Sequence, residues 1–455
     1  MPFQSRKFSI LSGVKSSTSQ QAKAPEILPP DVPIDEERIP NFNPENFYPA
    51  NPGDVLEGKY ELLTKLGWGT ASTVWLARDS SWSRWSKTRK YVAIKICTSN
   101  VEESDITHEL DITIHLSKVK SQHRARGILG TAIGSFGLES PNGSTHLALV
   151  FEPLREPLWL FRKRIMGENR TTRPFLPIFK TYIQILLEGL DFLHSEGHVV
   201  HTDLKLDNIM VVFEGQSVIE EFIQAQSQHP MAQKKIGNYT LYRCHNNFGD
   251  IDGKEALKKM YPKITDFGLA QRVDKPGPHI HPIQPDTYHA PEVLLGTGWS
   301  SSVDIWNFGL MVWELLAGHG LFQRGDPRQY SPVGHLAEMI ALMGPIPPKL
   351  IQREKEMRRW KWSPEVPNNQ GILCNNANDF YGGPFLTEEG KFVRNDLVPY
   401  ARSLQKEMPE CISEEESELF LQFMRRMLHW LPEERATAKE LKDDPWLKHL
   451  PRTAS

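Results

Sequence analysis

The sequence has few cysteines, no long apolar run and little net charge. Four cysteines occur in 455 residues, far apart and without Cys-x-x-Cys spacing, so we expect neither a zinc site nor disulfides. No apolar stretch approaches the roughly 20 residues that cross a membrane. Lysine and arginine (53) nearly balance aspartate and glutamate (56), which argues against a strongly basic nucleic-acid-binding surface. We expect a protein of the cytoplasm, the nucleus or both that contacts neither membrane nor nucleic acid directly. We also expect a monomer.

The first 53 residues differ in composition from the rest of the chain. They are rich in serine, glutamine and proline, and the prolines between Pro29 and Pro52 prevent a continuous helix or strand. Basic residues precede the first acid, Glu26, a composition found in organelle transit peptides and in many disordered tails. Because the stretch lacks an amphipathic apolar face, we favour a disordered or extended tail over residues 1–53.

The stretch His201-Thr-Asp-Leu-Lys-Leu-Asp-Asn208 carries more information than any other in the chain. It places an acid, a lysine and an amide, Asp203, Lys205 and Asn208, at the offsets that a phosphoryl-transfer loop requires. Taken alone, the octapeptide would be read as a polar loop beside a helix. Three further motifs argue against that reading.

The further motifs lie on both sides of this loop. Upstream, Leu66-Gly67-Trp68-Gly69-Thr70-Ala71-Ser72-Thr73-Val74 has glycines that let backbone amides approach phosphate oxygens, although Ser72 stands where a third glycine is usual. Tyr91-Val92-Ala93-Ile94-Lys95 follows at strand distance and ends on a lysine. Downstream, Lys263-Ile-Thr-Asp266-Phe267-Gly268 puts a carboxylate after a short apolar strand, and we expect Gly268 to let the backbone turn there. Four motifs in this order make coincidence negligible.

With these motifs, residues from about Asp54 to Leu447 resemble the eukaryotic protein-kinase family, and within it most closely the SR-protein kinase group. The narrower resemblance rests on the stretch 65–76, on threonine at position 202, on the hinge-like stretch 150–154 and on a long insertion before Asp266. It implies an α+β, two-lobed fold, with a small antiparallel β lobe that carries a helix C and a large, mainly helical lobe. We expect the small lobe at 54–153, the large lobe at 154–449 and the insertion at about 211–263.

The resemblance also implies ATP and Mg²⁺ as cofactors and a protein serine or threonine hydroxyl as the phosphoryl acceptor, with Arg/Ser-rich proteins as one candidate substrate class. Asp203 would accept the proton of the hydroxyl, and Lys205 would neutralise charge on the γ-phosphoryl group. Lys95 would pair with the phosphates and with an acid on helix C. Asn208 and Asp266 would hold the metal. The implied nucleotide-binding residues are Leu66, Gly67, Gly69, Ser72, Val74, Ala93, Lys95, Phe151, Glu152, Leu154, Asn208 and Asp266.

The acid that pairs with Lys95 is expected on a helix within residues 104–116. Glu109 is our choice. The apolar residues Ile106, Leu110 and Ile114 fit one helical face, but Thr113 stands where kinases usually have a large apolar side chain. Asp111 and Glu103 stay open as alternatives.

The insertion places 53 residues between Met210 and Ile264, where two short strands and a turn would suffice. Residues 217–233 have helical apolar spacing that Pro230 interrupts. We favour a tolerated surface insertion over a helix that packs on the catalytic core or docks a partner.

The segment after Gly268 predicts an enzyme that is active as synthesised. From 269 to 289 it has no serine, and Thr287 is its only threonine. Thr202 stands where many kinases have the arginine that reads an activating phosphate. Several prolines restrict the conformations of this segment.

The alternative to an enzyme is a pseudokinase-type scaffold that binds nucleotide and partners without turnover. Its signature would be loss of Lys95, Asp203 or Asp266, and all three are present. Three structural ties are expected from the resemblance: an ion pair of Glu292 with Arg435, an anchor from Asp304 to the catalytic loop, and packing of His201 on Phe267.

Substrate docking is expected to differ from that of SR-protein kinases. At the positions where those kinases carry acids of a docking groove, this chain has Gly334 and Ala341. Glu338 is an acid that could rebuild the groove from a neighbouring helical turn.

Overall fold

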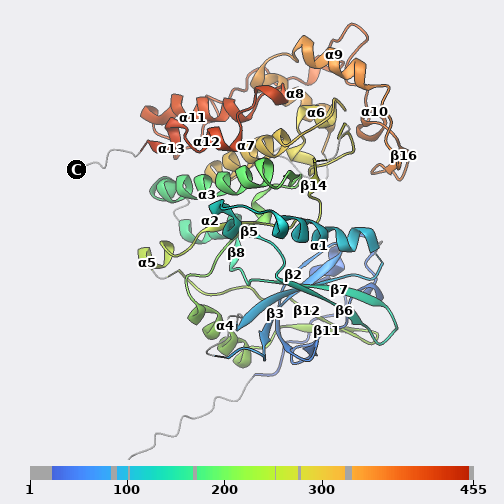
Figure 1. Ribbon diagram of the computed structural model, residues 1–455, viewed down its shortest axis with the longest axis vertical. Helices are drawn as coiled ribbons and strands as arrows, with labels where there is room; N and C mark the ends of the chain where they lie inside the picture. Colours follow the sequence, from blue (N-terminus) through green and yellow to red (C-terminus); the bar gives the residue numbers. More distant parts are fainter. Residues whose placement is uncertain are drawn as a thin grey trace, which may run out of the picture.

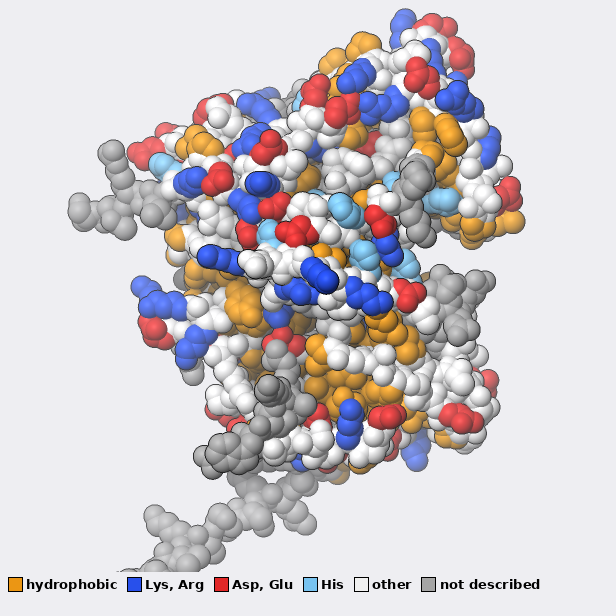
Figure 2. Space-filling view, in the orientation of Figure 1, with side chains coloured by type: hydrophobic (Ala, Val, Ile, Leu, Met, Phe, Trp, Pro, Cys, Tyr) orange, Lys and Arg blue, Asp and Glu red, His pale blue; other side chains and the backbone are white. Residues whose placement is uncertain are grey.

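The computed structural model describes residues 23–83, 90–100, 103–167, 172–251, 253–274, 278–322 and 330–449. The chain forms two lobes, a smaller one built on a β-sheet and a larger one built of helices, which lie in the lower and upper parts of Figure 1. The predicted two-lobed α+β fold is confirmed. On the face drawn in Figure 2, acidic and basic side chains are interspersed over both lobes. None of the described helices is long and apolar enough to span a bilayer.

The small lobe contains an antiparallel sheet in the order β1-β2-β3-β4-β7-β6. Strand β4, in the interior of this sheet, is buried on both faces, because apolar side chains pack against both sides of the sheet. One helix, α1 (Glu103–Lys118), lies between this sheet and the large lobe. The strands are β1 (Val55–Leu56), β2 (Tyr60–Gly69), β3 (Ser72–Asp79), β4 (Tyr91–Cys97), β6 (Gly134–Glu139) and β7 (Thr145–Phe151).

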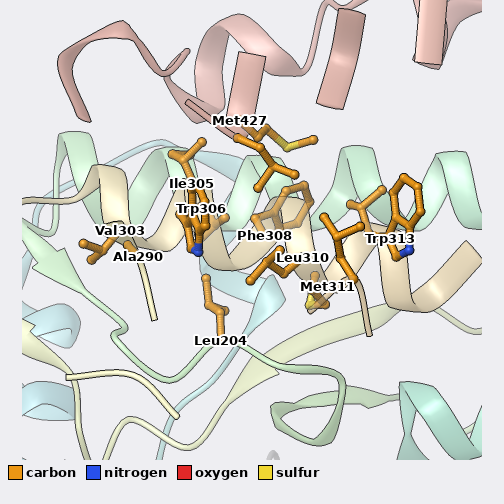
Figure 3. Close-up of a cluster of buried hydrophobic side chains, with 14 of the residues drawn as sticks. Leu204, Ala290, Val303, Ile305, Trp306, Phe308, Leu310, Met311, Trp313 and Met427 are labelled. Carbon is orange, nitrogen blue, oxygen red and sulfur yellow. The ribbon is translucent and has the colours of Figure 1, made fainter. Parts of the chain in front are cut away.

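The large lobe is organised around α7, whose side chains are all buried from Val303 to Trp313. A helix that is apolar around its whole circumference must lie inside other helices, and Figure 3 shows Trp306, Phe308 and Trp313 packed in this way. The helices of the lobe are α2 (Leu158–Met166), α3 (Leu176–Ser195), α6 (Pro291–Leu294), α7 (Ser302–Ala317), α8 (Pro332–Met343), α9 (Pro348–Met357), α10 (Ala377–Tyr381), α11 (Glu414–Met427), α12 (Ala438–Leu441) and α13 (Pro445–Lys448).

Short strands connect the lobes and present the polar motifs. A sheet in the order β5-β13-β10-β8 lies at the edge of the large lobe that faces the small lobe, with β10 and β13 antiparallel. Asn208 directly precedes β10 and Asp266 directly follows β13, so the antiparallel pairing brings the two residues to the same end of the sheet. The strands are β5 (Leu129–Gly130), β8 (Glu156–Pro157), β10 (Ile209–Val211), β13 (Pro262–Thr265), the pair β9 (Val199–Val200) and β14 (Gln271–Arg272), and the pair β15 (Val366–Pro367) and β16 (Leu373–Cys374).

Single turns of 3₁₀ helix fill several of the connections. They are η1 (Asp35–Arg38), η2 (Pro44–Asn46), η3 (Arg124–Ile128), η5 (Arg173–Phe175), η6 (Leu206–Asn208), η7 (Asp286–Tyr288), η9 (Asn395–Leu397) and η10 (Pro432–Glu434).

The insertion leaves the large lobe and packs against the small one, where α4 lies in Figure 1. It forms α4 (Gln216–Gln228), the hairpin of β11 (Gln233–Ile236) and β12 (Tyr239–Tyr242), and α5 (Gly253–Leu257). The expected helix is present but ends before Pro230. The favoured interpretation, a plain surface insertion, is wrong, because Ile219 and Phe222 of α4 are buried against Leu76 and Tyr91 of the sheet.

Residues 23–53 contain η1, η2 and turns joined by extended stretches. Their first part contacts the insertion, whereas Tyr48 and Ala50 pack on the small-lobe sheet. Ile27 forms a parallel bridge with Gln233, and the amide of Leu28 donates to the carbonyl of Gln233 at 2.9 Å. The start of the described tail is therefore held by contact with the insertion. The first 22 residues, on which the transit-peptide question depends, lie outside the described residues.

Candidate active site

The cleft between the lobes has a volume of about 560 Å³, within the range of small-ligand sites. All twelve residues expected to bind nucleotide line it. They come from the β2–β3 hairpin, from β4, from the connection after β7 and from the edge of the large lobe. Asp203 and Lys205 line an adjoining groove of about 930 Å³, which runs along the segment 282–286.

The roof of the cleft is the tight hairpin between β2 and β3. Gly69 pairs with Ser72, which leaves only Thr70 and Ala71 in the turn. A Cβ at Gly69 would lie 3.6 Å from the hydroxyl oxygen of Ser72, which is an ordinary contact distance. Ser72, which stands where a third glycine is usual, is buried and lines the cleft.

Lys95 lies at the centre of an ion-pair network. Its Nζ is 2.7 Å from Glu109 Oε2 and 3.2 Å from Asp266 Oδ1. Burial alone would lower the pKa of Lys95, but the carboxylates of Glu109 and Asp266 outweigh it and raise that pKa above its usual value. Of the three acids left open, Glu109 makes the pair. Asp111 is exposed on the far side of α1, and the side chain of Glu103 lies outside the described residues.

Asp266 turns the chain at the end of β13. Its φ is 64°, a left-handed conformation that is uncommon for a residue other than glycine. The expected turn at Gly268 is also present, because Gly268 lies in a turn that is closed by a hydrogen bond from the amide of Ala270 to the carbonyl oxygen of Phe267 at 3.2 Å. A Cβ at Gly268 would lie 3.5 Å from Asp266 Oδ1 and 4.0 Å from Glu109 Oε2, which are ordinary contact distances.

The catalytic-loop motif forms a compact hydrogen-bonded unit. Lys205 Nζ donates to both carboxylate oxygens of Asp203, at 2.8 and 3.0 Å. Asn208 Nδ2 donates to the backbone oxygen and to Oδ2 of Asp203, at 2.9 and 2.8 Å. Both donors of the Asn208 amide are thereby used within the loop, which leaves its carbonyl oxygen as the group available to a ligand.

Buried groups behind the loop hold it in place. The carboxylate of Asp304, on α7, accepts the amides of His201 at 2.7 Å and Thr202 at 2.9 Å. The ring of His201 packs on Phe267 with centroids 5.2 Å apart, and its Nε2 lies 2.9 Å from the carbonyl oxygen of Thr265. Both expected ties are confirmed.

The third expected tie, between Glu292 and Arg435, is also present. The two side chains are fully buried and pair in bidentate fashion, at 2.6 and 2.7 Å. Arg435 further donates to the carbonyl oxygens of His429 and Ser302. The pair joins α6, which follows the activation segment, to the end of the large lobe.

The cleft also contains residues that sequence reasoning missed. Lys263 forms an ion pair with Glu152 at 2.6 Å, and Met210 lies on the large-lobe side. Asn246 and Phe248 come from the insertion. Met210 and Lys263 flank recognised motifs and could have been inferred from them. The insertion residues carry no local pattern that marks them.

Comparison with known proteins agrees with this geometry. The family model for the protein kinase domain matches residues 60–447. The chain belongs to the protein kinase family.

The relatives of this chain indicate which class of protein kinase it resembles. A serine/threonine protein kinase of Aspergillus fumigatus is 35% identical over 431 residues, which cover 92% of each chain. A kinase of Physarum polycephalum named serine/threonine-protein kinase SRPK is 27% identical over 92% of each chain. The crystal structure of a kinase domain shares the fold, with a TM-score of 0.58 and 22% identity, over 89% of this chain and 100% of that one. The predicted class, a serine/threonine protein kinase similar to the SR-protein kinases, is confirmed.

The residues present fit the nucleotide and metal that the family uses. Asp266 and the carbonyl oxygen of Asn208 supply hard oxygen ligands of the kind that Mg²⁺ prefers. The ammonium of Lys95, held between two carboxylates, suits a phosphate oxygen as its next partner.

Proposed function

We propose that this protein is an ATP- and Mg²⁺-dependent kinase that phosphorylates serine or threonine side chains of proteins without prior phosphorylation of its own activation segment. The observation that carries the proposal is the joint arrangement of Lys95, Glu109 and Asp266 in one cleft with Asp203 and Lys205 beside it. When bound, ATP would supply the phosphoryl group, and Mg²⁺ would neutralise the negative charge of the phosphates.

The protein side chains position the reactants and stabilise charge. Lys95 orients the phosphates, and Glu109 keeps its ammonium pointed into the cleft. Asp203, fixed by Asn208 and Lys205, accepts the proton of the substrate hydroxyl. Lys205 then remains beside the transferring group, where its positive charge offsets the charge that develops there.

Activity without activation-segment phosphorylation is supported by neutral contacts along that segment. Thr202 stands where many kinases have an arginine that binds the activating phosphate. Its hydroxyl donates to the carbonyl oxygen of Leu269 at 2.8 Å. Gln284 donates to Asn307 Oδ1 at 2.6 Å and accepts the amide of Ala290 at 2.8 Å. These contacts order both ends of the segment without added charge.

The phosphorylatable tyrosine of the segment supports the same conclusion. The hydroxyl of Tyr288 donates to Glu314, and burial together with this carboxylate raises the pKa of Tyr288 well above its usual value. A phosphate on Tyr288 would therefore be placed against an acid.

We propose that docking of Arg/Ser-rich substrates is weaker than in SR-protein kinases. The amide of Gly334 is capped by Ser331 at the start of α8, and Ala341 packs against the core, so neither presents charge. Glu338 lies 2.9 Å from Arg402, so the acid on the neighbouring turn already has a basic partner.

We further propose that the protein acts as a monomer in the cytoplasm or nucleus, without contacting nucleic acid or membrane directly. Cys97, Cys244, Cys374 and Cys411 are all unpaired, which fits a reducing compartment. Imaging of the tagged full chain and sedimentation of the purified protein test these two points.

Phosphoryl transfer to a generic basic protein tests the main proposal against the scaffold alternative. The full chain should transfer the γ-phosphoryl group of ATP in the presence of Mg²⁺. Asp203→Asn should abolish turnover while ATP binding survives, and Asp266→Asn should remove the Mg²⁺-dependent part of ATP binding. A wild-type protein that binds ATP without turnover would establish the scaffold, and equal activity of Asp203→Asn would overturn the assigned mechanism.

A further inference from the structure

The stretch of the insertion at residues 244–249, here called the insertion strap, connects the two lobes beside the cleft. At its first end the amide of His245 donates to the carbonyl oxygen of Lys65 at 2.9 Å. The amide of Cys244 donates to Asp35 Oδ2 at 2.5 Å. Lys65 directly precedes Leu66, the first residue of the glycine-rich hairpin, so the strap is attached at the base of the roof.

The attachment point is itself buried and charged. Lys65 is 1% exposed, and its ammonium contacts the carboxylates of Asp35 and Glu36 and the carbonyl oxygen of Tyr242. Lys234, also buried, pairs with Glu37 at 2.6 Å. Because unpaired charges would be very costly in these positions, the tail, the insertion and β2 are locked to one another at this end.

The second end of the strap is attached to the large lobe. Arg155 donates to the carbonyl oxygen of Gly249 at 2.6 Å. Arg164, on α2, donates to Asn247 Oδ1 at 3.2 Å. Arg155 is 1% exposed and immediately follows Leu154 of the nucleotide cleft. The insertion strap therefore runs alongside the hinge between the lobes and is hydrogen-bonded to the small lobe at one end and to the large lobe at the other.

The middle of the strap lines the cleft. Phe248 is buried against Phe213 and Phe222, with ring centroids 4.8 and 4.3 Å apart. Leu66 packs on the same apolar cluster. Asn246, between the two ties, is exposed, lines the cleft and makes no side-chain hydrogen bond to another described residue.

The hydrogen bonds at the two ends of the insertion strap determine which part of a bound nucleotide Asn246 would contact. One neighbour of Asn246 is bonded to the residue before Leu66, and the strap then continues to the residue after Leu154. Both mark the hinge end of the cleft, whereas Lys95 and Asp266 mark the phosphate end. A polar amide at the hinge end faces the base or the sugar and not the phosphates.

We propose that Asn246 is a nucleotide-binding residue, which hydrogen-bonds the nucleoside part of ATP and is held in place by the insertion strap. The inference rests on the proposed function, since it requires ATP in this cleft. It assigns the insertion a direct part in substrate binding.

Asn246→Ala in the full chain tests this directly, with Asn238→Ala as the matched control. Asn238 is an exposed asparagine of the same insertion, in the turn between β11 and β12. Loss of one hydrogen bond should weaken ATP binding by about two- to tenfold in Asn246→Ala. The KM for ATP should rise by a similar factor with kcat unchanged, and Asn238→Ala should behave as wild type. Equal ATP affinity in the two variants would overturn the inference.

Adenosine distinguishes a contact to the nucleoside from an effect at the phosphates. Displacement of a fluorescent ATP analogue should show adenosine and ATP weakened by the same factor in Asn246→Ala. Weaker binding of ATP with unchanged binding of adenosine would refute the nucleoside assignment. Absence of ATP binding in the wild type would instead refute the proposed function, so the two failures are distinguishable.

Discussion

Truncation of Arg435 is expected to destabilise the large lobe strongly. Arg435→Ala leaves the carboxylate of Glu292 at 0% exposure without its bidentate partner. Removing one member of a buried pair typically costs about 3–5 kcal/mol, because the remaining charge is uncompensated. The carbonyl oxygens of His429 and Ser302 also lose a charged donor, and Trp306 loses the guanidinium packed 5.1 Å above its ring. The upper part of that range is therefore expected.

An exposed arginine in the same lobe provides the control. Arg353 pairs with Glu433 at 2.7 Å, with side chains 29% and 39% exposed. Hydrogen bonds from Arg353, and then from Lys349, lower the pKa of Glu433 to about 2. The stabilisation that this ion pair gives the folded protein is present above the ordinary glutamate pKa of about 4.3 and is lost as the pH falls toward 2. Solvent screens it, so Arg353→Ala should cost only about 0–1 kcal/mol at neutral pH.

Urea unfolding followed by tryptophan fluorescence compares the two variants, because Trp306 lies in the affected region. A third protein, with both Glu292→Gln and Arg435→Ala, removes the stranded charge. It should regain about 1 kcal/mol or more relative to Arg435→Ala alone. If Arg435→Ala loses less than about 1 kcal/mol, or no more than Arg353→Ala, the pair is not buried in solution and the argument fails.

Three further predictions concern activity. Protein made in bacteria and treated with phosphatase should keep its turnover, and a large loss that phosphorylation of Thr287 or Tyr288 restores would contradict constitutive activity. Arg/Ser-repeat peptides should be poor or distributive substrates compared with non-repetitive basic peptides, since each missing acid removes about 1 kcal/mol of attraction in a partly screened groove; tight, strongly salt-dependent, multi-site phosphorylation would contradict this. Glu109→Gln should raise the KM for ATP and lower kcat, because Lys95 loses its orienting charge; kinetics equal to wild type would show that Asp266 alone positions Lys95.

The residues that sequence analysis placed well belong to local motifs. Lys95 and Glu109 follow from a strand and a helix whose patterns are visible within a dozen residues. The left-handed conformation of Asp266 was missed, because a positive φ at an aspartate depends on the packing around it. Asn246 and Phe248 were missed for a different reason: their place in the cleft depends on how a long insertion folds back on the other lobe, and nothing in the local sequence encodes that.

The tail, the insertion and the activation segment are held by contacts that involve no phosphate group. A phosphate ordinarily orders such a segment through one to three charge-assisted hydrogen bonds to arginine. Here the segment is held by neutral hydrogen bonds from Thr202 and Gln284. The charged contacts that hold the tail and the insertion, Lys65 with Glu36 and Lys234 with Glu37, are largely buried, and Lys65 lies at the base of the roof. Buried pairs and neutral contacts respond little to ionic strength. The active arrangement should therefore persist across salt concentrations that would loosen an exposed phosphate-arginine contact.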